Sequence, residues 1–190
     1  MTTKQKIAAA LLSAVATAST FLLFVEKHEG FGPYKTIDGV RYYQAYKDVA
    51  HGWKVASICS GHTKGVKQGD VATKQQCVKF LDEDIQWAKK RVSSCLNAKV
   101  TQEQYNALVS FEFNTGLFCS TQMRRYIEQG NCRAAANEFN NSPQIDKATG
   151  KPKILNGKVV MKFTTAGGKV FRGLEIRRAE ERKMFEGGCD

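Results

Sequence analysis

An uncharged run near the N-terminus is the feature that most constrains this chain. Residues 7–25 contain no charged side chain over 19 positions, and the run follows Lys4 and Lys6. As a helix it would span about 28 Å, close to the thickness of a bilayer core, and the two lysines would remain on the cytoplasmic side. We therefore expect residues 1–25 to direct export and residues 26–190 to fold as one domain outside the cytoplasm.

The same run is a weak membrane anchor. Six alanines and four hydroxyl-bearing side chains dilute its nine large apolar residues, which contribute only about −3 to −5 kcal/mol to insertion. Three interpretations remain: a signal peptide cleaved after the Ala16-Thr17-Ala18 site, an uncleaved weak anchor, and a permanent membrane span. The apolar residues 21–25 that follow the cleavage site favour the uncleaved anchor.

The charge and composition of the chain limit the classes of partner that it can bind. The 190 residues include 29 Lys and Arg, 18 Asp and Glu, and only 3 Pro, for a formal net charge of +11. This excludes collagen-like, proline-rich and acidic disordered chains, and the length suits a single sizeable core. Because residues 1–25 hold few of the positive charges, the exported part is itself basic. A basic exported domain suits an anionic cell-wall polymer or lipid surface, and export argues against nucleic acid.

Helices dominate the pattern after residue 73. Apolar residues recur at i, i+3 and i+4, and Thr-x-x-Gln pairs that begin at Thr73 and Thr101 are capping boxes. The pattern predicts helices over about 73–94, 101–116, 121–129, 132–139 and 171–186.

Short strands are predicted on either side of turn-forming pairs. Asp38-Gly39 lies between two β-prone runs, 34–37 and 40–43, and indicates a two-residue hairpin. Asn156-Gly157 indicates a second hairpin. The sequence therefore predicts an α+β architecture, with a small N-terminal sheet lobe and a larger, mainly helical lobe.

All six cysteines follow residue 58, within the exported part. Export favours structural disulfides. Cys77 and Cys95 lie at opposite ends of one predicted helix, about 27 Å apart, whereas a disulfide tolerates about 7 Å between Cα atoms. Cys119 and Cys132 bracket another predicted helix and are disfavoured for the same reason, and the other pairings stay open. The cysteines lack C-x2-C spacing and the three histidines are scattered, so we expect no metal and no cofactor.

Two acids and a hydroxyl are the candidate catalytic groups. Glu29 lies four residues beyond the apolar run, at the expected end of its helix, and Asp48 follows the predicted hairpin. Ser57 begins the Ser-Ile-Cys-Ser-Gly-His-Thr segment, residues 57–63. Such groups could flank a glycosidic bond and a water molecule. The ordinary structural alternatives are an exposed helix-end carboxylate, a turn residue and a strand hydroxyl.

These segments resemble a known signature. Glu29-Gly30, then Ala-Tyr-Lys-Asp at 45–48, then residues 57–63 resemble the E-G…A-Y-x-D…T-I-x-Y-G-H-T pattern of phage-type lysozymes, the bacteriophage endolysins of glycoside hydrolase family 24. Downstream, residues 104–116 and the block Gly173-Leu174-x-x-Arg177-Arg178-x-x-Glu181 resemble the helical core of that family. A register shifted by one position would make Glu180 the last acid.

The resemblance implies a lysozyme-like fold with an active-site cleft between the two lobes. It also implies a monomeric muramidase that cleaves the β-1,4 bond between N-acetylmuramic acid and N-acetylglucosamine in peptidoglycan glycan strands. By position, Glu29 would be the general acid, Asp48 would stabilise charge at the anomeric carbon or act as a base, and Ser57 would hold the water. Inversion and retention of configuration both stay open.

Three departures from the signature affect the transfer of roles. Eighteen residues separate Glu29 from Asp48 and eight separate Asp48 from Ser57, and both spacings are longer than is usual in the family. Asp38 is the alternative second carboxylate, ranked lower because it belongs to the turn-forming pair. Ser57 replaces a threonine, which keeps the hydroxyl but loses the methyl group that stiffens χ1.

The N-terminal run resembles that of the signal-anchor-release endolysins, which are held inactive in the inner membrane and then leave the bilayer. The resemblance implies that residues 7–25 tether the chain to the host inner membrane and that release into the periplasm activates it. A further departure is a basic loop inserted at about 140–166, with five lysines. It is either a solvated loop or an added contact with anionic envelope polymers.

Overall fold

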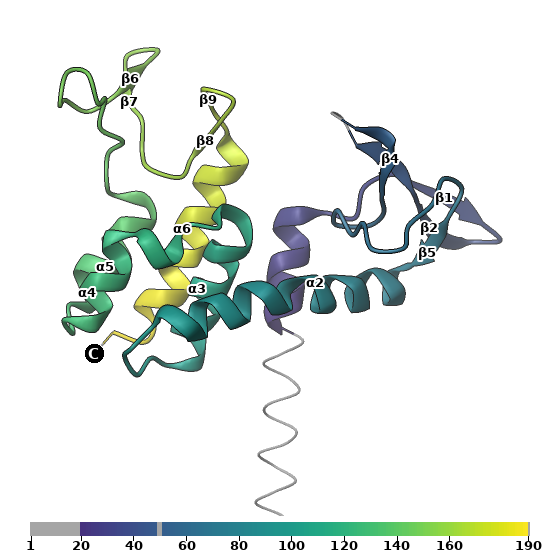
Figure 1. Cartoon of the computed structure of the whole chain (residues 1–190), viewed down its shortest axis with the longest axis horizontal. Coiled ribbons are helices and arrows are strands. Elements are labelled where there is room, and N and C mark those ends of the chain that lie inside the picture. The colour runs from purple at the N-terminus through teal and green to yellow at the C-terminus, as the bar shows by residue number, and fades with distance from the viewer. Residues whose placement is uncertain (1–19, 49–50, 190) are drawn as a thin grey trace, which may run out of the picture. The chain divides into compact units, whose positions relative to one another are not determined.

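The computed structural model describes residues 20–48 and 51–189. The chain divides into two compact units, an N-terminal unit of residues 1–86 and a C-terminal unit of residues 87–190 (Figure 1). Strands and turns make up most of the described N-terminal unit, and helices most of the C-terminal unit. The predicted α+β class is therefore correct, and the boundary lies within a long helix, α2 (Lys74–Cys95).

Two small antiparallel sheets form the N-terminal unit. A three-stranded sheet has the order β1-β2-β5, and a two-stranded sheet pairs β3 with β4. The strands are β1 (Tyr34–Ile37), β2 (Val40–Gln44), β3 (Tyr46–Asp48), β4 (Gly52–Ser57) and β5 (Val71–Thr73). The predicted first hairpin is confirmed, because Asp38 and Gly39 link β1 to β2 with φ values of 49° and 77°. Positive φ at both central residues is what a type I′ turn requires.

The core of this unit is small and includes a disulfide. Phe31 packs edge-on against Tyr43, with ring centroids 5.1 Å apart, and both belong to a buried cluster with Ile58, Ala72 and the Cys59–Cys77 disulfide. The disulfide joins the end of the β4 segment to the first turn of α2, with 5.4 Å between Cα atoms. A covalent link is useful here because short strands bury little apolar surface.

Helices of the C-terminal unit begin and end close to the predicted positions. After α2 come α3 (Gln102–Thr115), the short 3-10 helix η1 (Phe118–Ser120), α4 (Gln122–Glu128), α5 (Cys132–Asn140) and α6 (Arg172–Glu186). The capping box of α3 is present: the Gln104 amide donates to Thr101 Oγ1 at 3.2 Å, and the Thr101 amide donates to Gln104 Oε1 at 3.0 Å. Gly116 ends α3 in the left-handed conformation.

A buried charge cluster connects α3 with α6. Arg178 Nε lies 2.7 Å from Glu181 Oε2, Arg177 Nε lies 3.1 Å from Glu181 Oε1, and Ser110 Oγ donates to Glu181 Oε1 at 2.6 Å. Burial raises the pKa of the Glu181 carboxyl, while the guanidiniums of Arg178 and Arg177 lower it. Glu181, rather than the half-exposed Glu180, is therefore the buried acid of the C-terminal block.

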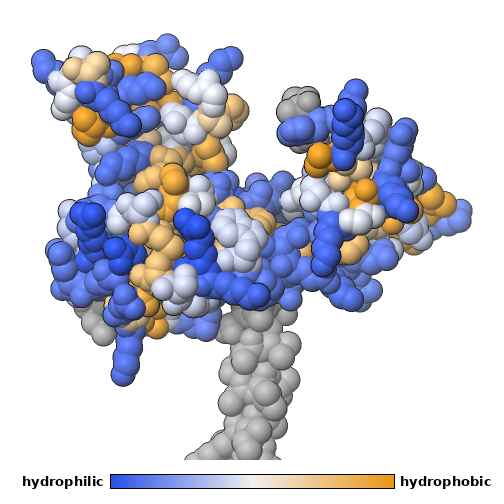
Figure 2. All heavy atoms as spheres, viewed as in Figure 1, coloured by the Kyte–Doolittle hydropathy of each residue, from blue (hydrophilic) through white to orange (hydrophobic). Residues whose placement is uncertain are grey.

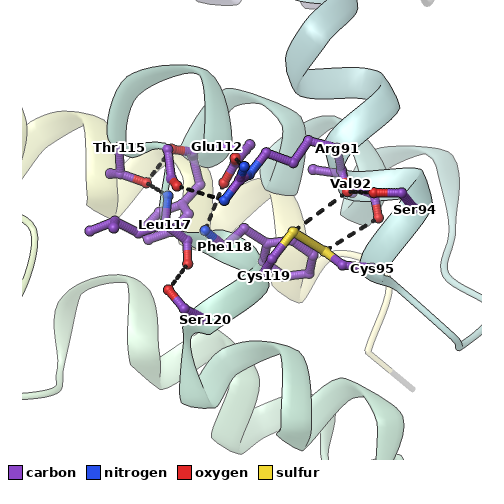
Figure 3. A network of polar contacts seen from close by, with 12 residues as sticks. Arg91, Val92, Ser94, Cys95, Glu112, Thr115, Leu117, Phe118, Cys119 and Ser120 are labelled. Carbon is purple, nitrogen blue, oxygen red and sulfur yellow. Dashed lines mark hydrogen bonds and ion pairs between the residues drawn. A yellow bond between two sulfur atoms is a disulfide. The ribbon is translucent and has the colours of Figure 1, made fainter.

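A second buried carboxylate connects α2, α3 and η1 (Figure 3). The Glu112 side chain is fully buried, lies 2.6 Å from Arg91 Nε and accepts a hydrogen bond from the Phe118 amide at 2.7 Å. The Cys95–Cys119 disulfide lies beside this network in Figure 3. Because unpaired buried charges are costly, this arrangement specifies how the ends of the three elements meet.

The three disulfides follow the geometric exclusions made from the sequence. Besides Cys59–Cys77, Cys95 pairs with Cys119 and Cys132 pairs with Cys189, each with 5.7 Å between Cα atoms. Neither disfavoured pairing occurs. The prediction of structural disulfides is therefore confirmed.

The connection between α5 and α6, described from the sequence as a basic loop over about 140–166, contains two short β-hairpins. We call residues 141–171 the hairpin insertion. The predicted Asn156-Gly157 turn joins β6 (Ile154–Leu155) to β7 (Lys158–Val159). A second hairpin, β8 (Thr165–Ala166) with β9 (Lys169–Val170), turns at Gly167 and Gly168. That Gly-Gly pair is also a hairpin signal, and it was not among the predicted turns.

The predicted membrane segment lies mostly outside the described residues. Residues 20–29 are helical, and Phe21 and Val25 are buried there, whereas residues 7–19 belong to the part that is not described. Over residues 20–48 and 51–189, each helix is too short or too polar to cross a membrane.

Candidate active site

Glu29 occupies the end of a helix, as the sequence predicts. It is the last helical residue of 20–29, and its side chain is partly exposed. Gly30 follows with φ of 68°, and its amide donates to the Glu26 carbonyl oxygen at 2.8 Å. A left-handed glycine that closes the last turn is a common helix C-terminus. The helix therefore stops directly after the candidate acid and exposes it at a chain reversal.

The chain after Glu29 is held against the segments that carry the other candidates. Ser60 Oγ donates to the Gly30 carbonyl oxygen at 2.7 Å. Gly32 has φ of 69°, and a Cβ there would lie 2.9 Å from Tyr46 Cε1 and 3.3 Å from the Cys59 carbonyl oxygen. Only glycine fits such a close approach without displacement of its neighbours. These contacts bring the Glu29 segment to β3 and to the loop after β4.

Asp48 and Ser57 belong to the same two-stranded sheet. In the β3–β4 pair, Tyr46 lies opposite Ser57, and the register shifts between Lys47 and Asp48, which pairs with Gly52. The Ser57 side chain is buried. The side chain of Asp48 lies outside the described part of the structure. The longer spacing seen in the sequence is thus taken up by the β1–β2 hairpin before β3 and by a bulge within the β3–β4 pair.

Tyr46 was not among the predicted catalytic residues, yet it packs between these segments. Its hydroxyl donates to the Cys59 carbonyl oxygen at 3.4 Å. Burial raises the pKa of the Tyr46 phenol, and a hydrogen bond with the Gly61 backbone partly opposes the rise. Its signal was its place in the Ala-Tyr-Lys-Asp motif, two residues before Asp48.

The alternative carboxylate, Asp38, has a structural explanation. It lies at the exposed tip of the β1–β2 hairpin with φ of 49°. Asp tolerates this left-handed conformation better than most residues do. Its place in the turn accounts for an aspartate at this position without any catalytic role.

His62 stabilises the loop that begins at Ser57. Its Nδ1 lies 2.9 and 3.0 Å from the two carboxylate oxygens of Asp84, and its ring stacks on Phe80 with centroids 4.4 Å apart. The backbones of Ile58 and His62 exchange two hydrogen bonds of 2.9 and 3.0 Å. His62 stood in the recognised motif, but its partner Asp84 is 22 residues away and carries no local signal.

Within residues 20–48 and 51–189, no group of three or more His, Cys, Asp or Glu side chains could hold a metal ion.

The fold matches that of known lysozymes. P22 lysozyme superposes with a TM-score of 0.58 at 24% sequence identity, over 88% of this chain and 95% of that structure. Such a likeness defines the class of fold, which is lysozyme-like.

Sequence comparisons then define the family. The profile of the phage lysozyme family matches residues 35–160, and the chain therefore belongs to that family, as the motifs indicated. The endolysin of Bacillus phage B103 is 33% identical over 82% of this chain and 52% of its own length, so this chain spans about half of that relative. The SAR-endolysin of bacteriophage PS119 is 28% identical over 90% of this chain and 86% of its own length.

Proposed function

We propose that this protein is an endolysin: a muramidase that hydrolyses the β-1,4 bond between N-acetylmuramic acid and N-acetylglucosamine in bacterial peptidoglycan and so lyses the host cell. The observation that carries the proposal is the joining of the three motif segments in one unit. The loop after Ser57 is bonded to Gly30, next to Glu29, and β3, which ends at Asp48, pairs with β4. Membership of the phage lysozyme family supports the same reaction.

In the proposed mechanism, Glu29 protonates the oxygen of the leaving sugar. Its side chain is partly exposed at the end of the helix. Asp48 stabilises the positive charge that develops at the anomeric carbon, or removes a proton from the attacking water. Ser57 positions that water through its hydroxyl. An inverting reaction needs the two carboxylates about 6.5 to 9.5 Å apart, so that the water fits between them.

Glu29→Gln is the central test of the proposal. General acid catalysis contributes about 100- to 10,000-fold, and we expect a loss of that size in the release of soluble fragments from purified peptidoglycan. Glu83→Gln is the matched control, because Glu83 is an exposed acid on α2 and should retain full activity. Unchanged lysis by the Glu29 variant would instead indicate a non-catalytic peptidoglycan-binding or membrane-active protein.

The second carboxylate is tested by a pair of variants. Asp48→Asn should reduce the rate by about 100-fold or more. Asp38→Asn should keep the rate, because asparagine also tolerates the left-handed turn conformation of this position. The opposite ranking would assign the role to Asp38.

The hydroxyl at position 57 is tested by its ability to be replaced. Ser57→Ala removes the group that would hold the water, and Ser57→Thr keeps it. We expect a loss of activity in the alanine variant and recovery in the threonine variant. Equal activity of all three forms would leave Ser57 as an ordinary buried strand residue.

The type of product separates hydrolysis from a lytic transglycosylase reaction. A transglycosylase would use Glu29 without Asp48 and would leave an anhydro sugar end. Mass analysis of digested peptidoglycan should show products with added water. Anhydro ends would overturn the hydrolytic proposal.

For location, the proposal is a chain tethered in the host inner membrane by residues 7–25 and later released to the periplasm as an active monomer. Similarity to relatives named SAR-endolysins supports this order of events. Burial of Phe21 and Val25 supports it further: these side chains belong to the apolar run, and they leave the folded domain if they lie in a bilayer. Tethering would therefore disturb the helix that ends at Glu29.

N-terminal sequencing of the active periplasmic protein tests this regulation. An intact N-terminus is expected. A protein that begins after Ala18 would show signal-peptide cleavage and overturn release of an uncleaved anchor.

A further inference from the structure

The hairpin insertion exposes aliphatic side chains on a preformed β surface. Ile154 and Val159 lie directly opposite each other in the β6–β7 pair, and such partners project from the same face of a hairpin. Ile154 is 62% exposed and Val159 is 46% exposed. Ile145, Val170 and Phe171 are also exposed. In Figure 2, apolar residues lie interspersed with hydrophilic ones over the region that carries β6 to β9.

The insertion is also strongly basic. Residues 141–171 contain six lysines and a single acid, Asp146. Lys151, Lys158 and Lys169 are exposed. The Asp146 side chain is hydrogen-bonded within its own turn, because its Oδ1 accepts from the backbone amides of Ala148 at 2.8 Å and Thr149 at 3.1 Å. The insertion therefore exposes both cationic and aliphatic groups, and in the β6–β7 hairpin they project from opposite faces, because Lys158 pairs with Leu155 and not with Ile154 or Val159.

Backbone pairing holds this surface in one shape. The backbone amide of Gln144 donates to the Val160 carbonyl oxygen at 2.8 Å, and the Gln144 carbonyl oxygen accepts from the Lys153 amide at 2.8 Å. The Val160 amide in turn donates to the Lys153 carbonyl oxygen at 2.9 Å. Val160 itself is buried. A surface that is already ordered loses little conformational entropy when it binds.

The insertion is anchored to the helices of the C-terminal unit. The Phe163 ring packs edge-on against Phe111 of α3, with centroids 4.8 Å apart. Lys162 Nζ lies 3.0 Å from Glu138 Oε2 of α5. Lys162 and Phe163 thus attach the insertion to the helices. The exposed lysines and aliphatic side chains of the insertion face solvent and can contact a partner.

We propose that the hairpin insertion binds the surface of an anionic phospholipid bilayer. Entry of the aliphatic face into the boundary between headgroups and acyl chains is favourable, and the lysines on the opposite, polar face extend along their flexible stems to lipid phosphates. A polysaccharide offers hydrogen-bonding groups and charge, but its apolar surface is far smaller than that of a bilayer and buries Ile154 and Val159 less well. This surface is separate from the groups assigned to hydrolysis, and it would keep a released enzyme near the membrane.

The test uses the full chain and vesicles of two compositions, pure phosphatidylcholine and equimolar phosphatidylcholine with phosphatidylglycerol. Residues 7–25 are common to every variant and bind both kinds of vesicle, so the measured quantity is the ratio of the affinities for anionic and for pure phosphatidylcholine vesicles, compared between variants. We expect the triple variant Lys151→Gln, Lys158→Gln, Lys169→Gln to lose about 100-fold in affinity for the anionic vesicles. Ile154→Ser with Val159→Ser should lose about tenfold.

Matched controls separate this surface from general charge. The triple variant Lys79→Gln, Lys90→Gln, Lys99→Gln removes the same charge from exposed positions elsewhere, and it should lose less than about threefold. Thermal melts should show that all variants fold. Glu29→Gln should bind vesicles normally, which keeps the lipid proposal independent of the muramidase proposal.

Two results would overturn the proposal. Equal losses in both lysine variants would indicate non-specific attraction. Normal vesicle binding by the insertion variants, together with weaker binding to purified peptidoglycan sacculi, would assign the surface to a wall polymer instead.

Discussion

The two units are stabilised in different ways. In the N-terminal unit, short strands are linked by left-handed turns around a small core, with one disulfide and the partly exposed acid Glu29 at a helix end. In the C-terminal unit, helices enclose the fully buried carboxylates Glu112 and Glu181, which pair with arginines, and two further disulfides lie there. The same residue type therefore occurs in two environments: the partly exposed Glu29 is the proposed catalytic acid, whereas the buried, paired glutamates specify packing.

The largest effect should come from the same chemical change made in each unit. Glu181→Gln removes the carboxylate charge beside the buried guanidiniums of Arg177 and Arg178, and we expect a loss of about 3 to 5 kcal/mol in the free energy of unfolding. Glu29→Gln should remove activity and leave the unfolding midpoint nearly unchanged. Denaturant titration of both variants makes the comparison.

Glu180→Gln is the control for the buried cluster. Glu180 neighbours Glu181 in α6 but is half-exposed, and we expect a loss of about 1 kcal/mol or less. If Glu181→Gln were equally mild, the C-terminal unit would not depend on its buried charges.

Removal of disulfides should rank by the length of chain that each encloses. Cys132 and Cys189 are separated by 57 positions, and Cys59 and Cys77 by 18. Replacement of each pair by serine should cost about 4 and about 3 kcal/mol, because a longer loop gains more entropy in the unfolded chain. Calorimetry under matched conditions measures the difference, and a reversed ranking would show that the small core of the N-terminal unit depends more on its link.

The close approach at Gly32 should matter for both stability and activity. Gly32→Ala places a methyl group against Tyr46 and the Cys59 carbonyl, and we expect a loss of about 1 to 3 kcal/mol. Gly65→Ala has the same positive φ but open space around the new methyl group, so it should cost about 1 kcal/mol. Peptidoglycan digestion should fall only in the Gly32 variant, and equal activities would separate this contact from the site.

The smallest effects are expected at the helix caps, where the units should behave alike. Thr73 Oγ1 accepts a hydrogen bond from the Gln76 backbone amide at 3.3 Å, and Thr101 Oγ1 accepts one from the Gln104 backbone amide at 3.2 Å. Each Thr→Ala variant should lose about 1 kcal/mol. Thermal melts measure both losses, and a clear difference between them would show that a cap depends on its unit.

Local patterns predicted much of the fold. The helices follow from i, i+3, i+4 periodicity and capping pairs, and the β1–β2 and β6–β7 hairpins follow from Asp38-Gly39 and Asn156-Gly157. Each of these signals depends on a few consecutive residues, so the local sequence is enough to predict the element. The hairpin at Gly167-Gly168 carried the same kind of signal, and it was missed because the surrounding lysines suggested a solvated loop.

The candidate site was predicted only in part. Glu29 stands at its helix end, as the sequence predicted. The structure adds that Asp48 and Ser57 each end a strand of the same two-stranded sheet. The packing of Tyr46 beside Gly32 and the pairing of His62 with Asp84 were not predicted. Each joins residues more than ten positions apart, and sequence spacing alone does not say which distant side chains meet.

By itself, the sequence determined the family, the positions of the predicted helices, the two Asx-Gly hairpins and the exclusion of two cysteine pairings. The tertiary structure alone decided the partners of the six cysteines, the burial of Glu181 rather than Glu180, and the folding of the hairpin insertion on Phe111 and Glu138. The physical reason is range: periodicity, caps and turns arise from neighbouring backbone, whereas disulfides, buried ion pairs and close glycine contacts depend on segments that only packing brings together.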